Sequence, residues 1–552
     1  MKKVASKIVS TSETEPASQT SWLPMIVVGM SQVLMSFNVN ALPVSICGVV
    51  ASFHAPPTVV GTAIVTYSLF LASFVMLGAK IGARFGPRLV FRVTVVLFGV
   101  AMLLMALSAS AMMMIVAQCI AGTAAAALVP TLVVLIAANY RGRQQIQALG
   151  YLGAAEALAG VLAFLIAGSL GTWISWRYPF GLLVFLAISV FILSKHLKPV
   201  ERQSDLKVDK LGVLMAASAI ILISVGFNSV NRWGLLLARS SAPFSLLGLS
   251  PALAAIVVGT VLSQAFFAWS RKRRAEQQTP LIALELIESP LHRLAVLSLF
   301  VSVGLGAAVT FLISLYIQTV QGRSSLRTGL AITPFSLSIL AASILVLRLF
   351  QRQPIRHIAR YAYAVIAAGL ALLAVVIRNE WGTLMVMFGL IVVGLGLGAL
   401  VTLLFTVLAG GVPEELAGDA GSLRGTTSNL AAAIGTAVAG ALMIGVLSAS
   451  VRMSLVDNPL IPSALKEQVD LDNIKFVGNN RLLEVLSQTT AAPHQIDEAL
   501  RINTEARLRS LKICFVSMTG LALLAIFPAG RLDGSVGGDD AAVERRASER
   551  PL

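Results

Sequence analysis

One acidic residue stands deep inside a long apolar stretch: Glu156, in the segment YLGAAEALAGVLAF. A carboxyl group held in a low-dielectric interior can exchange a proton at physiological pH, and it can also bind a cationic group. Its flanks are glycine and alanine, which let a helix approach a neighbour or leave an open cavity. We predict that Glu156 couples protons or recognises cations. The alternative is a packing contact with Gln118 or another polar partner.

Neutral polar side chains lie within other apolar stretches and are expected to face inward. Each can be a ligand contact or a hydrogen bond between helices. Asn38 and Asn40 are ~200° apart around a helix, so both cannot face one cavity. Arg424 is interpreted as reaching for the membrane surface, with an ion pair to Glu156 as the alternative. The candidate proton-coupling and substrate residues are Glu156, Gln118, Asn38, Gln32, Tyr67, Tyr316 and Asn429, with Asn40 and Gln264 as further inward positions.

The sequence lacks the residue patterns of metal sites, disulfide frameworks, nucleotide-binding loops and nucleic-acid-binding patches. No histidine has a partner at metal-ligand spacing, and the cysteines Cys47, Cys119 and Cys514 include no CxxC pair. No G-x-x-x-x-G-K-[ST] loop is present. The net charge of +16 is spread over short clusters and does not form one patch for nucleic acid. We expect no metal, no cofactor, no nucleotide-binding domain, no nucleic acid partner and no enzyme activity.

The composition is that of a polytopic membrane protein. Of 552 residues, 57% are hydrophobic and 12% charged, with a mean hydropathy of +0.84, whereas soluble domains hold roughly 25% charged residues. About fourteen apolar runs reach the ~20 residues that a membrane helix needs. These expected helices are 23–46, 58–80, 89–109, 111–137, 147–170, 178–197, 210–230, 246–269, 292–318, 326–349, 359–377, 381–409, 420–448 and 511–529.

Lysine and arginine set the expected orientation. Clusters such as Lys80–Arg92 and Arg271–Arg274 alternate with loops of low positive charge. Because cytoplasmic loops carry the excess of positive charge, the N-terminus is predicted to be cytoplasmic. An even number of helices then places the C-terminus on the same side. The expected location is the cell inner (cytoplasmic) membrane.

The domain organisation is predicted from these spans and from a short internal repeat. RFGPRLVFR (84–92) is echoed by RQPIRHIAR (352–360), each with a proline and with arginines four apart. A cytoplasmic tail (1–20) precedes one six-helix half (21–199), two inserted helices (200–280), a second six-helix half (281–530) and a disordered cytoplasmic tail (531–552). The polar segment 449–510 is expected to be a long external loop with short amphipathic helices that caps the protein. An independent binding module is the alternative.

Several ordered motifs resemble one family. The loop IGARFGPR contains Gly82, Arg84, Gly86 and Arg88 in the frame of the signature loop between helices two and three of the major facilitator superfamily. NALP (40–43), GTAAAALVP (122–130), WRYPF (176–180) and the segment 418–442 are similar to further motifs of its fourteen-helix drug:proton antiporters. The resemblance implies two six-helix halves, two added central helices, and alternating access around a midplane cavity.

The sequence departs from the antiporter pattern at several charged or special positions. The signature-loop aspartate is Ala83, the helix-four arginine is Gln118, and the helix-five motif reads AFLIAG (163–168). The resemblance implies a secondary transporter that exports amphipathic organic compounds, such as drugs, antibiotics or a self-made toxin, by proton antiport. Its expected partners are a small organic substrate, a proton and the lipid bilayer. Two alternatives stay open: an importer or facilitator of a small metabolite with the same fold, and a non-transporting membrane scaffold.

Overall fold

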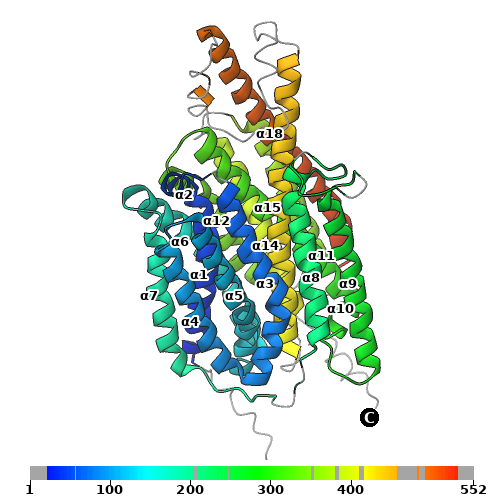
Figure 1. Ribbon diagram of the computed structural model, residues 1–552. Helices are drawn as coiled ribbons and strands as arrows, with labels where there is room; N and C mark the ends of the chain where they lie inside the picture. Colours follow the sequence, from blue (N-terminus) through cyan, green and yellow to red (C-terminus); the bar gives the residue numbers. More distant parts are fainter. Residues whose placement is uncertain are drawn as a thin grey trace, which may run out of the picture.

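The structure is a computed structural model that describes most of the chain (Figure 1). It describes residues 21–532 except 56–57, 204–205, 207, 240, 246–247, 350–352, 379–383, 410–415, 457–481, 484–485 and 487–491. The predicted tail 1–20, nearly all of the tail 531–552 and the middle of the segment 449–510 therefore lie outside the described residues.

The described part is all-α, as predicted, with one isolated bridge between Leu237 and Leu249. The helices are α1 (Leu23–Val44), α2 (Ile46–Phe53), α3 (Thr58–Phe85), α4 (Pro87–Ala106), α5 (Ala111–Asn139), α6 (Gly142–Trp173), α7 (Tyr178–Leu193), η1 (Ser194–His196), α8 (Lys210–Trp233), α9 (Pro251–Ala275), α10 (Glu285–Glu288), α11 (Pro290–Leu315), η2 (Tyr316–Val320), α12 (Ser325–Leu349), α13 (Ile355–Val376), α14 (Leu384–Ala409), α15 (Ala417–Val456) and α18 (Pro493–Ala529). Fourteen of them are long and apolar enough to cross a membrane, which confirms the expected number.

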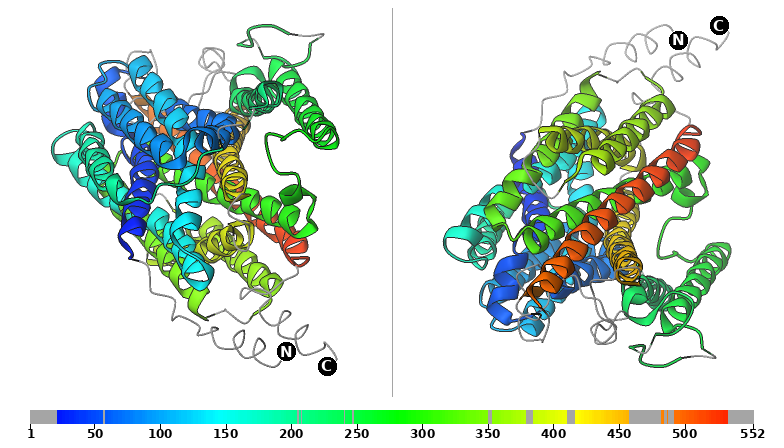
Figure 2. Two further views of the ribbon diagram at one scale, coloured as in Figure 1. Left: turned by 90° about the horizontal axis from the view of Figure 1, so that it is seen from below. Right: turned by 90° about the horizontal axis from the view of Figure 1, so that it is seen from above.

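Two hydrophobic clusters organise the bundle. The first is formed mainly by α1 and α3–α7, and the second mainly by α11–α14 and α18. The hairpin α8–α9 lies beside the bundle (Figure 2), and α8 packs against α3 and α15. The inserted pair thus contacts α3 of the first cluster and also α15, which contributes Ala439 and Met443 to the second. The residue limits of the predicted halves remain a prediction.

Helices α3 and α5 approach each other closely at two glycines. A Cβ atom on Gly78 of α3 would collide with the backbone of Ala126, and one on Gly122 of α5 would collide with the backbone at Tyr67. Small residues at such points let two membrane helices pack backbone to backbone. This contact fixes the position of Tyr67 relative to α5.

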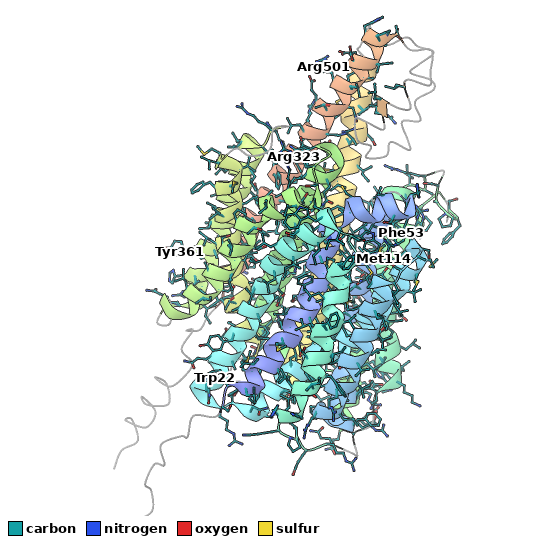
Figure 3. The ribbon with its side chains drawn as sticks, turned by 90° about the vertical axis from the view of Figure 1, so that its left-hand side faces the viewer. Trp22, Phe53, Met114, Arg323, Tyr361 and Arg501 are labelled. Carbon is teal, nitrogen blue, oxygen red and sulfur yellow. The ribbon has the colours of Figure 1, made fainter. Side chains whose placement is uncertain are left out.

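Two helices project beyond one end of the bundle. Helix α15 has 40 residues and α18 has 37, and Figure 1 shows both continuing past the other helices. Figure 3 shows Arg501 of α18 well beyond Phe53 and Arg323, which lie at that end. Residues 449–456 and 493–510 therefore continue long helices, whereas short separate helices were expected there. Arg501 supports the extension by pairing with Glu498 at 2.7 Å and with Glu505 at 2.9 Å, one helical turn away on either side.

Candidate functional site

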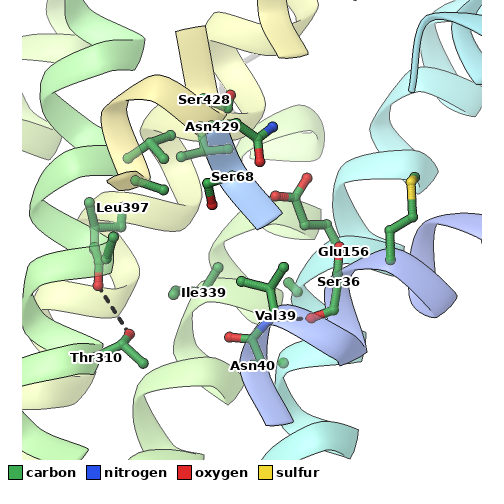
Figure 4. A pocket seen from close by; sticks show the side chains of 18 of the residues that line it. Ser36, Val39, Asn40, Ser68, Glu156, Thr310, Ile339, Leu397, Ser428 and Asn429 are labelled. Carbon is green, nitrogen blue, oxygen red and sulfur yellow. Dashed lines mark hydrogen bonds between the residues drawn. The ribbon is translucent and has the colours of Figure 1, made fainter. Parts of the chain in front are cut away.

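A cavity of about 290 Å³ lies between the two groups of helices. One wall comes from α1, α3, α5 and α6, and the other from α11, α12, α14 and α15. Figure 4 shows apolar side chains such as Ile339 and Leu397 in this wall, beside polar ones such as Ser68 and Asn429. The cavity is amphipathic, and both halves of the chain build it.

An ion pair crosses this cavity. Glu156 of α6 and Arg424 of α15 meet with Oε2 and Nη2 2.5 Å apart. The arginine is almost covered, with 8% of its side chain exposed, whereas the glutamate is 41% exposed. Figure 4 shows the Glu156 carboxyl group on the side that faces Ser68 and Asn429. The predicted inward position of Glu156 agrees with this arrangement, but the preferred interpretation of Arg424 was wrong: it pairs with Glu156 and does not reach for the membrane surface.

The Arg424 guanidinium is held on its other side by an aromatic ring. Its central carbon lies 4.0 Å from the centroid of the Phe405 ring on α14. At that distance the ring quadrupole attracts the cation, most strongly where water is excluded. Arg424 is therefore fixed between a ring and a carboxylate, and the carboxylate is the more exposed of the two charged partners.

Gln32 of α1 is a third member of this cluster. Its Nε2 atom lies 3.5 Å from Oε2 of Glu156 and donates to the Ser36 hydroxyl at 3.0 Å. Its Oε1 atom is buried and accepts no hydrogen bond from any described residue. Gln32 therefore places a donor nitrogen beside the carboxyl group of Glu156.

Three other predicted inward residues also line the cavity. Tyr67 of α3 is buried in the wall, and Asn429 of α15 lies one turn beyond Gly425, to whose carbonyl its Nδ2 atom donates at 2.9 Å. Asn40 lines the cavity and Asn38 does not, in agreement with the expectation that only one of them faces it.

The structure places Asn38 and Gln118 together outside the cavity. Asn38 Nδ2 donates to Gln118 Oε1 at 2.9 Å, and Gln118 Nε2 donates back to Asn38 Oδ1 at 3.1 Å. Both side chains are fully buried between α1 and α5. The two amides satisfy each other, so neither contacts Glu156, and the suggested Gln118–Glu156 contact was wrong. The structure favours the helix-packing alternative for both residues.

Two further candidates lie elsewhere. Tyr316 starts the π-helical turn η2 after α11 and is buried in the second hydrophobic cluster, outside the cavity lining. Gln264 lies exposed on α9, on the hairpin beside the bundle. Neither contributes to the cavity wall that the described residues form.

The signature loop makes the tight connection between α3 and α4. Gly86 has φ of +96°, a conformation that disfavours side chains, and Pro87 starts α4. Gly82 packs against Thr131 of α5. Arg88 donates to the carbonyl oxygen of Lys195 at 2.7 Å, after the end of α7, whereas Arg84 is exposed. Arg88 thus ties the start of α4 to the chain that follows α7.

The sequence-based search missed a second ion pair between helices of the two groups. Lys80 of α3 donates to both carboxylate oxygens of Asp419 on α15, at 2.8 and 3.0 Å. Asp419 also accepts the backbone N–H of Ala283 at 2.8 Å. The span expected to begin at residue 420 excluded Asp419 from the buried acids. Helix α15 begins at Ala417, so its first turn carries an acidic residue that can also interact with the helix dipole.

Gln318 was also missed, at the opposite end of the bundle. It lies in η2, and its Nε2 atom donates to the carbonyl oxygen of Pro43 at 2.7 Å. Its Oε1 atom accepts the backbone N–H of Cys47 at 3.3 Å. Pro43 and Cys47 are four residues apart, where α1 ends and α2 begins, so this side chain bridges the break in the helix. No motif marks such a residue.

The matches with known proteins agree with this architecture. The family model described as Major Facilitator Superfamily matches residues 28–436. The chain therefore belongs to the Major Facilitator Superfamily and is a multi-pass membrane transporter protein of that class, which is not a class of enzymes.

Two relatives at low identity are named as a transporter and as an efflux pump. The chain is 24% identical over 453 residues to a "Probable actinorhodin transporter" of Streptomyces coelicolor, covering 80% of this chain and 76% of that one. It is 26% identical over 463 residues to the drug efflux pump JefA of Mycobacterium tuberculosis, covering 82% and 86%. The crystal structure of the human organic anion transporter MFSD10 shares the fold with a TM-score of 0.55 and 14% identity, over 92% of this chain and 98% of that chain.

Proposed function

We propose that this protein exports amphipathic organic compounds across the cell inner membrane in exchange for protons, with both chain ends in the cytoplasm. The observation that carries the proposal is the Glu156–Arg424 ion pair, which joins α6 to α15 inside an amphipathic cavity. The name of one relative, the drug efflux pump JefA, supports the direction of transport. The cluster of Lys80, Arg84, Arg88 and Arg92 at the α3–α4 end supports a cytoplasmic position for that end.

The exchange follows from the two states of the Glu156 carboxyl group. When ionised, it is paired with Arg424, and α6 and α15 are held together by charge. When protonated, it loses most of that attraction, since the Coulomb energy depends on both charges. Binding and loss of one proton therefore change the contact between two helices from different halves. Alternating access needs a coupling of this kind.

Everted membrane vesicles test the proposal. Respiration acidifies the vesicle lumen, and a pH-sensitive dye reports proton release when a transported compound is added. We expect release for the native protein on adding an uncharged compound such as chloramphenicol. Release should be lost in Glu156→Gln and kept in Glu276→Gln, which changes an exposed acid on the C-cap of α9.

The other outcomes identify the alternatives. Proton release that survives Glu156→Gln would exclude Glu156 as the coupling site. Net uptake of a compound by intact cells would point to an importer. Neither proton release nor protection of growing cells by any compound of the panel would favour a scaffold without transport.

A further inference from the structure

The cavity holds two charged side chains of opposite sign and no others among the described lining residues. Glu156 and Arg424 are in direct contact, so their charges sum to zero. The one further titratable lining group is Tyr67, a phenol that is neutral at physiological pH. A ligand in this cavity therefore meets no net charge while Glu156 is ionised.

A cationic ligand gains little electrostatic binding energy from the Glu156 carboxylate. To bind the Glu156 carboxylate at full strength, it would have to displace Arg424, which is 8% exposed and packed on the Phe405 ring. The displaced guanidinium would remain as an unpaired charge at a covered site, and such charges are strongly unfavourable. If Arg424 keeps its partner, its positive charge opposes that of the ligand.

An anionic ligand also gains little electrostatic binding energy, in this case from the Arg424 guanidinium. Of the two charged partners, the Glu156 carboxylate is the more exposed, with 41% of its side chain exposed against 8% for Arg424. An anion would therefore meet the negative end of the pair first. When Glu156 is protonated, Arg424 still stacks on Phe405 with little surface open to a ligand.

The rest of the wall suits uncharged polar groups. Neutral hydroxyls and amides from both groups of helices lie among apolar side chains, and they include Ser36, Ser68, Asn40, Thr310, Ser428 and Asn429. Such groups donate to and accept from the carbonyl, hydroxyl and amide groups of an organic molecule. Figure 4 shows Thr310 and Ser428 well apart on different sides of the space.

We propose that the cavity selects amphipathic compounds with no net charge, and that Arg424 disfavours organic cations by neutralising the carboxylate of Glu156. This inference rests on the proposed export function. It makes Arg424 a specificity-determining residue, because specificity is achieved by placing a repulsive element against the wrong ligand as well as attractive ones for the right ligand.

Two dyes with the same ring system test the inference. Rhodamine B carries no net charge at neutral pH, and rhodamine 6G is a permanent cation. Purified protein in liposomes with an imposed pH gradient is assayed for the initial transport rate of each dye. We expect the native protein to move rhodamine B at least tenfold faster than rhodamine 6G. Arg424→Gln should lower this ratio at least tenfold, and Arg424→Lys, which keeps the charge, should preserve it.

The double variant Glu156→Gln/Arg424→Gln controls for misfolding by an unpaired charge. Its cavity again has no net charge, so it should prefer rhodamine B, although its transport should no longer follow the pH gradient. Equal rates for both dyes in the native protein, faster transport of an anionic dye such as fluorescein, or an unchanged ratio in Arg424→Gln would overturn the inference. If no compound moves at all in the native protein, the proposed function itself fails.

Discussion

The side-chain amide of Gln318 donates to the carbonyl oxygen of Pro43 at 2.7 Å, so the turn after α11 is tied to the end of α1. The same amide accepts the N–H of Cys47. In the lining of the cavity, Pro43 is the residue nearest to this tie. We infer that opening of the cavity at this end separates α1 from α11, and the two hydrogen bonds oppose that separation.

Replacing Gln318 by alanine should therefore favour opening at this end. The two lost hydrogen bonds cost together roughly 2 kcal/mol, so the open population should rise about thirtyfold, since 1.4 kcal/mol is a factor of ten. Cys47 is a native reporter, because it touches Gln318. We expect a membrane-impermeant maleimide to label Cys47 about thirtyfold faster in Gln318→Ala. Gln264→Ala, on the exposed face of α9, should leave the rate unchanged, and Cys47→Ser should abolish the signal. A rate in Gln318→Ala equal to the native one would contradict the role of this tie.

The curve of Cys47 labelling rate against pH should also shift in Gln318→Ala. Burial raises the pKa of the Cys47 thiol above its ordinary value, and the thiolate is the reactive form. In the native protein the labelling rate should keep rising at a pH where an exposed thiol is already fully ionised. Opening in Gln318→Ala rehydrates the thiol and lowers its pKa, so the rate–pH curve should shift toward lower pH. A curve that rises in height without shifting would mean that access alone changes.

Asp419 should matter more for stability than its partner Lys80. Asp419→Ala removes three hydrogen bonds, two from Lys80 and one from the N–H of Ala283. Lys80→Ala removes two of them. We expect Asp419→Ala to lower the free energy of unfolding by about 3 kcal/mol and Lys80→Ala by about 2 kcal/mol, measured by thermal unfolding of the purified protein in detergent.

The charge-swapped pair Lys80→Asp/Asp419→Lys gives a sharper comparison. It restores the attraction between α3 and α15 but not the acceptor for Ala283, so its stability should fall between the native protein and Asp419→Ala. The exposed lysine Lys272, 3.9 Å from Glu276, supplies the control: Lys272→Ala should change the free energy of unfolding by less than about 0.5 kcal/mol. A swapped protein as unstable as Asp419→Ala would show that the Ala283 contact alone is important.

The buried amide pair of Asn38 and Gln118 should affect stability and leave substrate selection intact. Removing either amide leaves the other buried without its partner, which costs about 1–2 kcal/mol. Asn38→Ala and Gln118→Ala should each destabilise by that amount, and the double variant should lose less than the sum. The dye preference of both single variants should equal that of the native protein. A changed preference would assign these residues to the substrate path.

The helices were predictable from the sequence because membrane helices are defined by length and apolar content. The start of the first span at residue 23 and of the fourth at residue 111 agrees with α1 and α5. The inward position of Glu156 was predictable for a related reason, since a carboxyl group in such a segment cannot face lipid. The alternation of Asn38 and Asn40 follows from helix geometry alone.

The partners of these residues were not predictable in the same way. Arg424 lies about seven residues into α15, or ~10 Å at 1.5 Å per residue, which a linear count places near the membrane surface. Its contact with Glu156 depends on how α6 and α15 slide past each other, and one sequence carries no information on that register. Gln318 was missed for a further reason. Its role arises from a break between α1 and α2 far away in the chain, and a single glutamine gives no signal of that.

Because α15 is one long helix, movement at the cavity can be measured with a probe on its projecting end. It is continuous for 40 residues, from the turn that carries Asp419, through Arg424 at the cavity, to the part that projects beyond the bundle. At 1.5 Å per residue it spans ~60 Å, about twice the ~30 Å hydrocarbon core. If a helix of this length tilts as a rigid body about the ion pair, its distant end is displaced further than the residues near the pair. A spin label or fluorophore on the projecting turns would follow the transport cycle in real time without a probe in the cavity.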